Sequence, residues 1–317
     1  MGIPSRGRAG LAVGVIGAYL VGALTALQAR LNGDLGAGLD DAFLAAVISF
    51  GSGLVIVAAL SALLPAGRQG LRRLREGVRR GAPDRIPWWM LCGGAAGAFT
   101  VTTQGLTVGA IGVALFSVGM VAGQTVGGLV LDRMGVGPAG VAPVTAPRLV
   151  GALLVLAAVV VSLGGDALAS VPWWMLALPF AVGAGVAWQT AVNGRLRQRV
   201  GSALAATTAS FAGGTVLLAV VAAGSVLANG WPTSFPTEPW TYAGGLLGVI
   251  YIFTSATLTP RTGVLVMTVG SVLGLITSSI AYDLIWIPDV PTPPWRTIAM
   301  AALALGGVAA TLWRRRR

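Results

Sequence analysis

Gln-Ala-Arg-Leu-Asn-Gly at residues 28–33 returns 161 residues later as Gln-Thr-Ala-Val-Asn-Gly at residues 189–194. Ser-Phe at residues 49–50 returns at the same spacing, at residues 210–211. Internal repetition over so long a period indicates two copies of one structural unit. We therefore place the first unit at residues 1–165 and the second at residues 166–317.

The composition sets the environment of both units. Hydrophobic residues make up 55% of the chain and charged residues 10%, with a mean hydropathy of +0.82. A water-soluble domain cannot cover this much apolar surface, so the chain belongs in a bilayer. A spanning helix needs about 20 mostly apolar residues. The sequence supplies ten such runs, at residues 11–29, 42–64, 88–108, 112–131, 148–164, 173–193, 203–228, 239–258, 263–286 and 297–313.

These runs predict an all-α integral membrane protein, because barrel strands would show ten-residue alternation of polar and apolar positions. Each unit holds five runs, and an odd number makes the second unit enter the membrane from the opposite side. We therefore expect ten transmembrane helices in two inverted five-helix repeats, joined near Gly164 to Pro172. A second set of matches, at a spacing of 151, supports the repeat: Gly119, Gly123 and Asp132 match Gly270, Gly274 and Asp283.

The net charge of +11 comes from arginines that follow membrane topology, which argues against nucleic-acid binding. With a cytoplasmic N-terminus and one crossing per run, the arginine clusters lie inside, and only Arg30 and Arg296 lie outside. This pattern predicts a multi-pass membrane protein with both termini in the cytoplasm. The cytoplasmic loop from Arg68 to Arg85 is either a topology anchor or a contact for anionic lipid headgroups.

Polar side chains inside apolar runs are the candidate functional residues, because hydrocarbon cannot satisfy their hydrogen bonds. Gln28 and Asn32 are four residues apart, as are Gln189 and Asn193, so each pair shares one helix face. They are either matched groups of a gate or cavity, or groups that terminate a helix with Asn-Gly as the turn.

Other candidates lie deeper in the runs. Gln124 lies near the middle of its run. It either links two helices by a hydrogen bond or contacts the substrate. Asp132 and Asp283 are possible coupling groups, although we expect Asp132 to snorkel or to pair with Arg133. The remaining substrate-binding candidates are Thr103, Gln104, Trp188, Ser49 and Ser210.

The sequence lacks the residues that several kinds of catalytic and metal site require. The chain has no histidine and a single cysteine, Cys92, which excludes histidine catalysis and a multi-cysteine metal site. We expect no metal and no cofactor. A membrane enzyme would need a nucleophile or an acid-base pair near the headgroups, and the acidic pair Asp40-Asp41 is the only acidic cluster. We therefore do not expect an enzyme.

The chain resembles the YdcZ-like family of the drug/metabolite transporter (DMT) superfamily. The resemblance is carried by both Gln-x-x-x-Asn-Gly motifs, each followed by Ser-Phe and then by Pro-Trp before a glycine-rich run. It implies a protein of the bacterial inner membrane, built as a fused pair of five-span units with an EamA-like fold, and a central cavity formed by spans one to four and six to nine. Small multidrug exporters of this superfamily carry a glutamate in the first span, whereas residues 11–29 and 173–189 here contain no carboxylate.

The expected function is secondary-active transport of small polar or amphipathic metabolites or drugs, by alternating access between the two inverted repeats. The partners are then a small-molecule substrate and the lipid bilayer, and a fused pair of units does not need to dimerise. The alternative is a lipid flippase or an accessory membrane subunit without small-solute transport.

Overall fold

The computed structural model describes residues 8–79, 85–137, 140–141, 144–162, 172–251, 254, 264–286 and 293–311. Both chain ends, nearly all of the expected joint between the units, and most of the last seven residues of the predicted run 239–258 lie outside the described residues.

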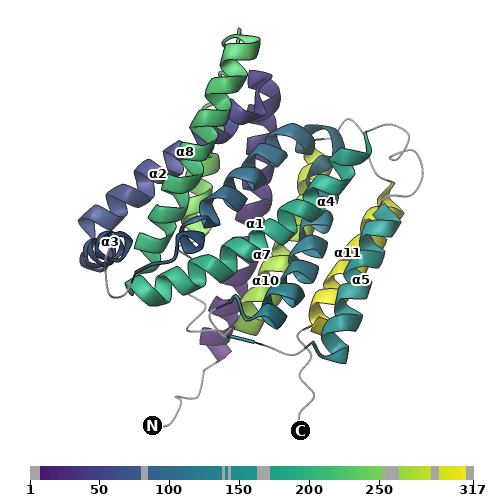
Figure 1. The fold of residues 1–317 in the computed structure, drawn as a ribbon. Helices are drawn as coiled ribbons and strands as arrows, with labels where there is room; N and C mark the ends of the chain where they lie inside the picture. Colours follow the sequence, from purple (N-terminus) through teal and green to yellow (C-terminus); the bar gives the residue numbers. More distant parts are fainter. Residues whose placement is uncertain are drawn as a thin grey trace, which may run out of the picture.

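The described residues are helical throughout their regular structure and contain no strand. Five helices are long and apolar enough to cross a membrane, and three shorter ones are also apolar. Residues 244–251 form a further helical segment. Figure 1 shows the elements, which are α1 (Arg8–Leu39), α2 (Ala42–Leu63), α3 (Pro65–Val78), η1 (Trp88–Leu91), α4 (Gly93–Met134), α5 (Ala146–Ser162), α7 (Trp173–Val200), α8 (Ala203–Asn229), η2 (Pro239–Ala243), α10 (Val264–Ile285) and α11 (Pro294–Thr311).

Helix α4 contains two of the predicted runs. Its 42 residues would extend about 60 Å as one straight helix, twice the thickness of a bilayer core. Gly112 interrupts it with φ 80° and ψ 162°, a conformation that suits glycine. The chain changes direction there and continues as a second arm (Figure 1). The Asp283 carboxylate caps the second arm, accepting from the backbone N–H groups of Val113 at 2.8 Å and Ala114 at 2.7 Å.

Helices α1 and α7 continue well past the two Asn-Gly motifs. The first motif lies inside α1, which ends at Leu39, and the second inside α7, which ends at Val200. The interpretation of Asn-Gly as a helix-terminating turn is therefore wrong. Gly33 serves close packing, because a Cβ there would lie 2.9 Å from the Cβ of Val108 on α4.

Glycines also set the two tightest helix crossings, and these crossings correspond by the repeat. On α1 and α10, a Cβ on Gly22 would overlap the carbonyl oxygen of Ser271. On α7 and α4, a Cβ on Gly183 would overlap the carbonyl oxygen of Met120. In a bilayer, helices gain little from burying apolar surface, so backbone contact through small residues holds such crossings together.

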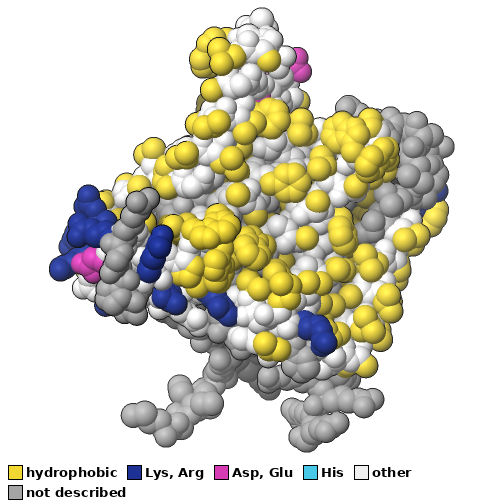
Figure 2. Space-filling model, in the orientation of Figure 1, with side chains coloured by type: hydrophobic (Ala, Val, Ile, Leu, Met, Phe, Trp, Pro, Cys, Tyr) yellow, Lys and Arg dark blue, Asp and Glu magenta, His cyan; other side chains and the backbone are white. Residues whose placement is uncertain are grey.

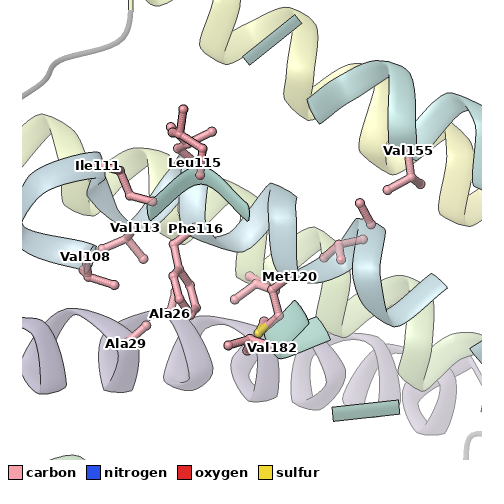
Figure 3. Packing of buried hydrophobic residues seen from close by; sticks show 14 of the residues in the cluster. Ala26, Ala29, Val108, Ile111, Val113, Leu115, Phe116, Met120, Val155 and Val182 are labelled. Atoms are coloured by element: carbon pink, nitrogen blue, oxygen red, sulfur yellow. The ribbon is translucent and has the colours of Figure 1, made fainter. Parts of the chain in front are cut away.

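The core lies around the second arm of α4. Phe116 is fully buried, and Figure 3 shows its ring directed at the helix that carries Ala26 and Ala29, which is α1. Met120, one turn further along α4, lies beside Val182 of α7 in the same view. The α4 arm thus holds an element of each unit in place.

Helix α3 lies where we expected a loop. Its residues 65–78 form an amphipathic helix that runs crosswise to α2 and α8 and is seen nearly end-on in Figure 1. Gly67 and Gly70 are buried, and Gly70 packs against Ser202 and Ala205 at the start of α8. The arginines face outward, and Figure 2 shows basic side chains gathered over α3 and along the same edge of the molecule.

Candidate functional site

A cavity of about 700 Å³ opens among the helices. Its walls come from α1, α2, α4, α7, α8, residues 244–251 and α10, with one residue each from α5 and α11. A volume of this size suits a small organic molecule. Six of the ten substrate-binding candidates line it, which brings both units to one site: Gln28, Gln104, Gln124, Gln189, Asn193 and Ser210.

The first of two polar clusters at the cavity is the Gln28 cluster, which comprises Gln28, Asn32, Ser49, Gln104 and Gly244. Gln28 Nε2 donates to the carbonyl oxygen of Gly244 at 2.8 Å, and Asn32 Nδ2 donates to Gln104 Oε1 at 2.7 Å. Ser49 Oγ lies 2.7 Å from the position a Cβ on Gly244 would take. All four polar side chains are buried, with Asn32 only 1% exposed. This cluster is therefore tightly packed.

The equivalent residues form the Gln189 cluster, which comprises Gln189, Asn193, Ser210, Gly93 and Gly97. Gln189 Nε2 and Asn193 Nδ2 both donate to Ser210 Oγ, at the longer distances of 3.4 Å and 3.3 Å. Gln189 and Asn193 are only half-buried, and all three polar residues line the cavity. The second cluster is thus looser than the first.

The glycines that face the two clusters repeat as well. A Cβ on Gly248 would lie 2.7 Å from Gln28 Nε2, and one on Gly97 would lie 2.6 Å from Gln189 Nε2. Gly93 faces Asn193 as Gly244 faces Asn32. Our sequence reasoning missed these glycines. Their signal is present at the spacing of 151 residues, where residues 93, 94 and 97 match residues 244, 245 and 248.

Two aromatic rings lie between the clusters. Phe50 and Phe211 pack with their ring centroids 4.9 Å apart, and both line the cavity. Each ring also faces a glycine of the other unit, because a Cβ on Gly214 would overlap Phe50 and one on Gly53 would overlap Phe211. The contact environments of the two rings are therefore reciprocal.

The other candidates have different positions. The Gln124 side chain is exposed to the cavity and has no hydrogen-bond partner among the described residues, which disfavours the helix-linking interpretation. Trp188 packs against Trp89 with ring centroids 6.3 Å apart, away from the cavity lining. Thr103 is 1% exposed inside α4 and, like Asn32 and Ser49, does not line the cavity.

Neither proposed coupling carboxylate lines the cavity. Asp132 forms an ion pair with Arg148, so the expected pairing with Arg133 is wrong. Successive residues on a helix do not face each other, whereas α5 brings Arg148 alongside. Asp283 caps the second arm of α4, a structural task that the sequence did not reveal.

The charged groups of the lining are Arg148 and Arg197, and no aspartate or glutamate is among the described lining residues. Among the described residues there is also no cluster of three metal-ligating side chains. The described lining is therefore built from amides, hydroxyls, aromatic rings and two guanidinium groups.

Comparison with known families agrees with this description. A search of curated proteins found no match to the chain. A family profile described as "Putative inner membrane exporter, YdcZ" matches it twice, at residues 13–161 and at residues 173–310. These two matches cover nearly the whole chain, one in each half. The chain is therefore a two-unit member of the YdcZ family of inner membrane exporters within the drug/metabolite transporter superfamily.

Proposed function

We propose that this protein is a secondary-active transporter that exports small polar or amphipathic molecules by alternating access between two inverted five-helix units, residues 1–165 and 166–317. The observation that carries the proposal is the unequal closure of two equivalent clusters. The Gln28 cluster has short, buried hydrogen bonds, and the Gln189 cluster has long, half-exposed ones. Two units with the same contacts can exchange these states.

Alternating access needs a seal that opens without a large cost. In the closed Gln28 cluster, Asn32 Oδ1 and Ser49 Oγ are buried without a hydrogen-bond partner among the described residues. Each such group costs about 1–3 kcal/mol in a closed cluster and regains this energy when water reaches it. This cluster therefore has hydrogen bonds that hold it shut and unpaired oxygens that favour opening, which keeps the two states close in free energy.

The arginines give the orientation within this proposal. Arg197 follows Asn193 by one helical turn on α7 and lines the cavity together with Arg148, and the positive-inside rule puts this part of the cavity in the cytoplasm. The described arrangement is then the inward-open state, with the Gln28 cluster as the closed outer gate. An exporter loads its cargo in this state.

The amphipathic helix α3 fits the same orientation. It carries five exposed arginines at residues 68–79 and runs crosswise to the long helices. We place it at the cytoplasmic surface, where about 1 kcal/mol of attraction to anionic lipids is expected per arginine. It then fixes the ends of α2 and α8, against which it packs.

Transport by purified protein in vesicles tests the proposal. With an imposed pH or sodium gradient and a panel of labelled metabolites, at least one compound is expected to move, and Gln124→Ala is expected to reduce its rate about tenfold. Val216→Ala is the matched control, because Val216 is 67% exposed on the outer surface of α8. Rapid lipid scrambling with no movement of any compound would instead support a flippase.

A further inference from the structure

The cavity has an unbalanced charge. Its two charged lining residues are both arginines, Arg148 of α5 and Arg197 of α7, and the described lining contains no acid. Asp132 offsets Arg148 through their ion pair, but it does not itself line the cavity. The described part of the lining therefore carries net positive charge.

Arg197 differs from its neighbours on α7. Arg195 donates to the carbonyl oxygens of Gly135 and Gly137, and Arg199 donates to the carbonyl oxygen of Arg85. The Arg197 side chain is exposed and has no hydrogen bond or ion pair with any residue that the structure describes. Topology accounts for arginine anywhere at this membrane edge, but it does not require one directed into the cavity.

The rest of the wall is neutral. Amides of Gln28, Gln104, Gln124 and Gln189 offer both donors and acceptors, and Phe50 and Phe211 offer apolar faces. Low-dielectric walls focus the field of the two guanidinium groups into the space between them. An anion is attracted into such a space and a cation is repelled from it. Guanidinium groups also match the planar geometry of carboxylates and the oxygens of phosphates and sulfonates.

We infer that the cargo of this transporter is an amphipathic organic anion, with its acidic group at Arg197 and Arg148 and its body among the glutamine amides and the Phe50–Phe211 pair. This inference rests on the proposed transport function and adds the class of substrate. The anionic group is carried either by a free small molecule or by a lipid headgroup.

The first test measures the charge preference of the cavity without any cargo. In a Cys92→Ser background, Thr207→Cys places one thiol on the cavity wall. Its reaction rates with an anionic methanethiosulfonate (sulfonatoethyl) and a cationic one (trimethylammonioethyl) are compared, each relative to its rate with a free thiol in solution. The anionic reagent is expected to be favoured by about fivefold or more, given a nearby unit charge in a partly hydrated space. Arg197→Gln is expected to remove most of this preference, whereas Arg199→Gln, which deletes the same charge two residues away, retains it.

The second test uses two probes of similar size and opposite fixed charge, benzenesulfonate and benzyltrimethylammonium. In vesicles containing the purified protein, only benzenesulfonate is expected to move faster than in protein-free vesicles, and Arg197→Gln is expected to slow it about tenfold. Movement of fluorescently labelled phosphatidylglycerol without movement of benzenesulfonate would assign the anionic group to a lipid.

The inference is overturned if the cationic reagent reacts as fast as the anionic one, or if benzyltrimethylammonium is the probe that moves. A preserved preference for the anionic reagent, with neither probe nor lipid moving, would count against the transport function while leaving the anion-selective cavity in place. The two claims thus fail separately.

Discussion

Replacing Gly244 by alanine is expected to open the Gln28 cluster. A Cβ at this position overlaps Asn32 Oδ1 and lies 2.7 Å from Ser49 Oγ, and both atoms are buried and cannot move aside without disturbing their neighbours. Overpacking of a close-packed site costs about 1–3 kcal/mol. Displacing Asn32 also breaks its 2.7 Å hydrogen bond to Gln104 and leaves buried polar groups unpaired, for about 1–3 kcal/mol more.

A destabilisation of about 2–6 kcal/mol, confined to the closed form of this cluster, shifts the equilibrium toward the outward-open state by roughly 30-fold or more. Labelling of a cavity thiol reports the shift. Thr25→Cys in a Cys92→Ala background places one on the α1 wall. In whole cells, a membrane-impermeant maleimide is expected to label it slowly in the parent and at least tenfold faster with Gly244→Ala.

Gly93→Ala is the matched control, because its Cβ would lie 2.6 Å from Asn193 Oδ1 in the equivalent cluster. That cluster is already loose, so the added methyl group is expected to leave labelling from outside unchanged or lower. The reasoning is refuted if folded Gly244→Ala protein is labelled from outside no faster than the parent. It is equally refuted if both glycine substitutions raise the labelling alike.

Three further predictions concern the scaffold. Asp283→Asn replaces a carboxylate that accepts two backbone hydrogen bonds with an amide that offers one acceptor oxygen. The free energy of unfolding in detergent is therefore expected to fall by about 1–3 kcal/mol. An unchanged melting temperature would show that Asp283 does not stabilise the start of the second α4 arm. Gly123→Ala is expected to reduce the yield of folded protein in the membrane severely, because its Cβ would overlap the carbonyl oxygen of Phe180. Gly109→Ala is the control, because its Cβ would meet no atom within 4 Å. Equal yields of the two variants would show that α4 and α7 do not need this close contact. Phosphatidylglycerol is expected to raise the melting temperature of the parent protein, and neutralising Arg72, Arg75 and Arg79 together is expected to abolish this rise. A rise equal to that of the parent would place α3 away from lipid headgroups.

The repeated motifs contribute residues of both copies to the wall of one cavity. Gln28, Gln189, Asn193 and Ser210 line one cavity because residues at equal positions in two copies of one unit meet where the units meet. The same reasoning assigned a turn to Asn-Gly, which was wrong. Local sequence signals a turn there, but packing of Gly33 against Val108 outweighs the local preference.

Other features have no signature within a short stretch of sequence. The pairing of Asp132 with Arg148 and the capping of Val113 by Asp283 join residues that only the tertiary arrangement brings together. The amphipathic character of α3 is visible in residues 65–78, but its packing against Ser202 depends on where α8 begins in space.

Composition and repetition by themselves determined a membrane protein of two related units, because bilayer crossing requires long apolar helices and duplication preserves the spacing of polar groups. Only the tertiary structure decided which of the two equivalent clusters is tightly packed and which arginines line the cavity. The physical reason is that both states satisfy the same local sequence, and the difference between them lies in contacts between helices that are distant along the chain.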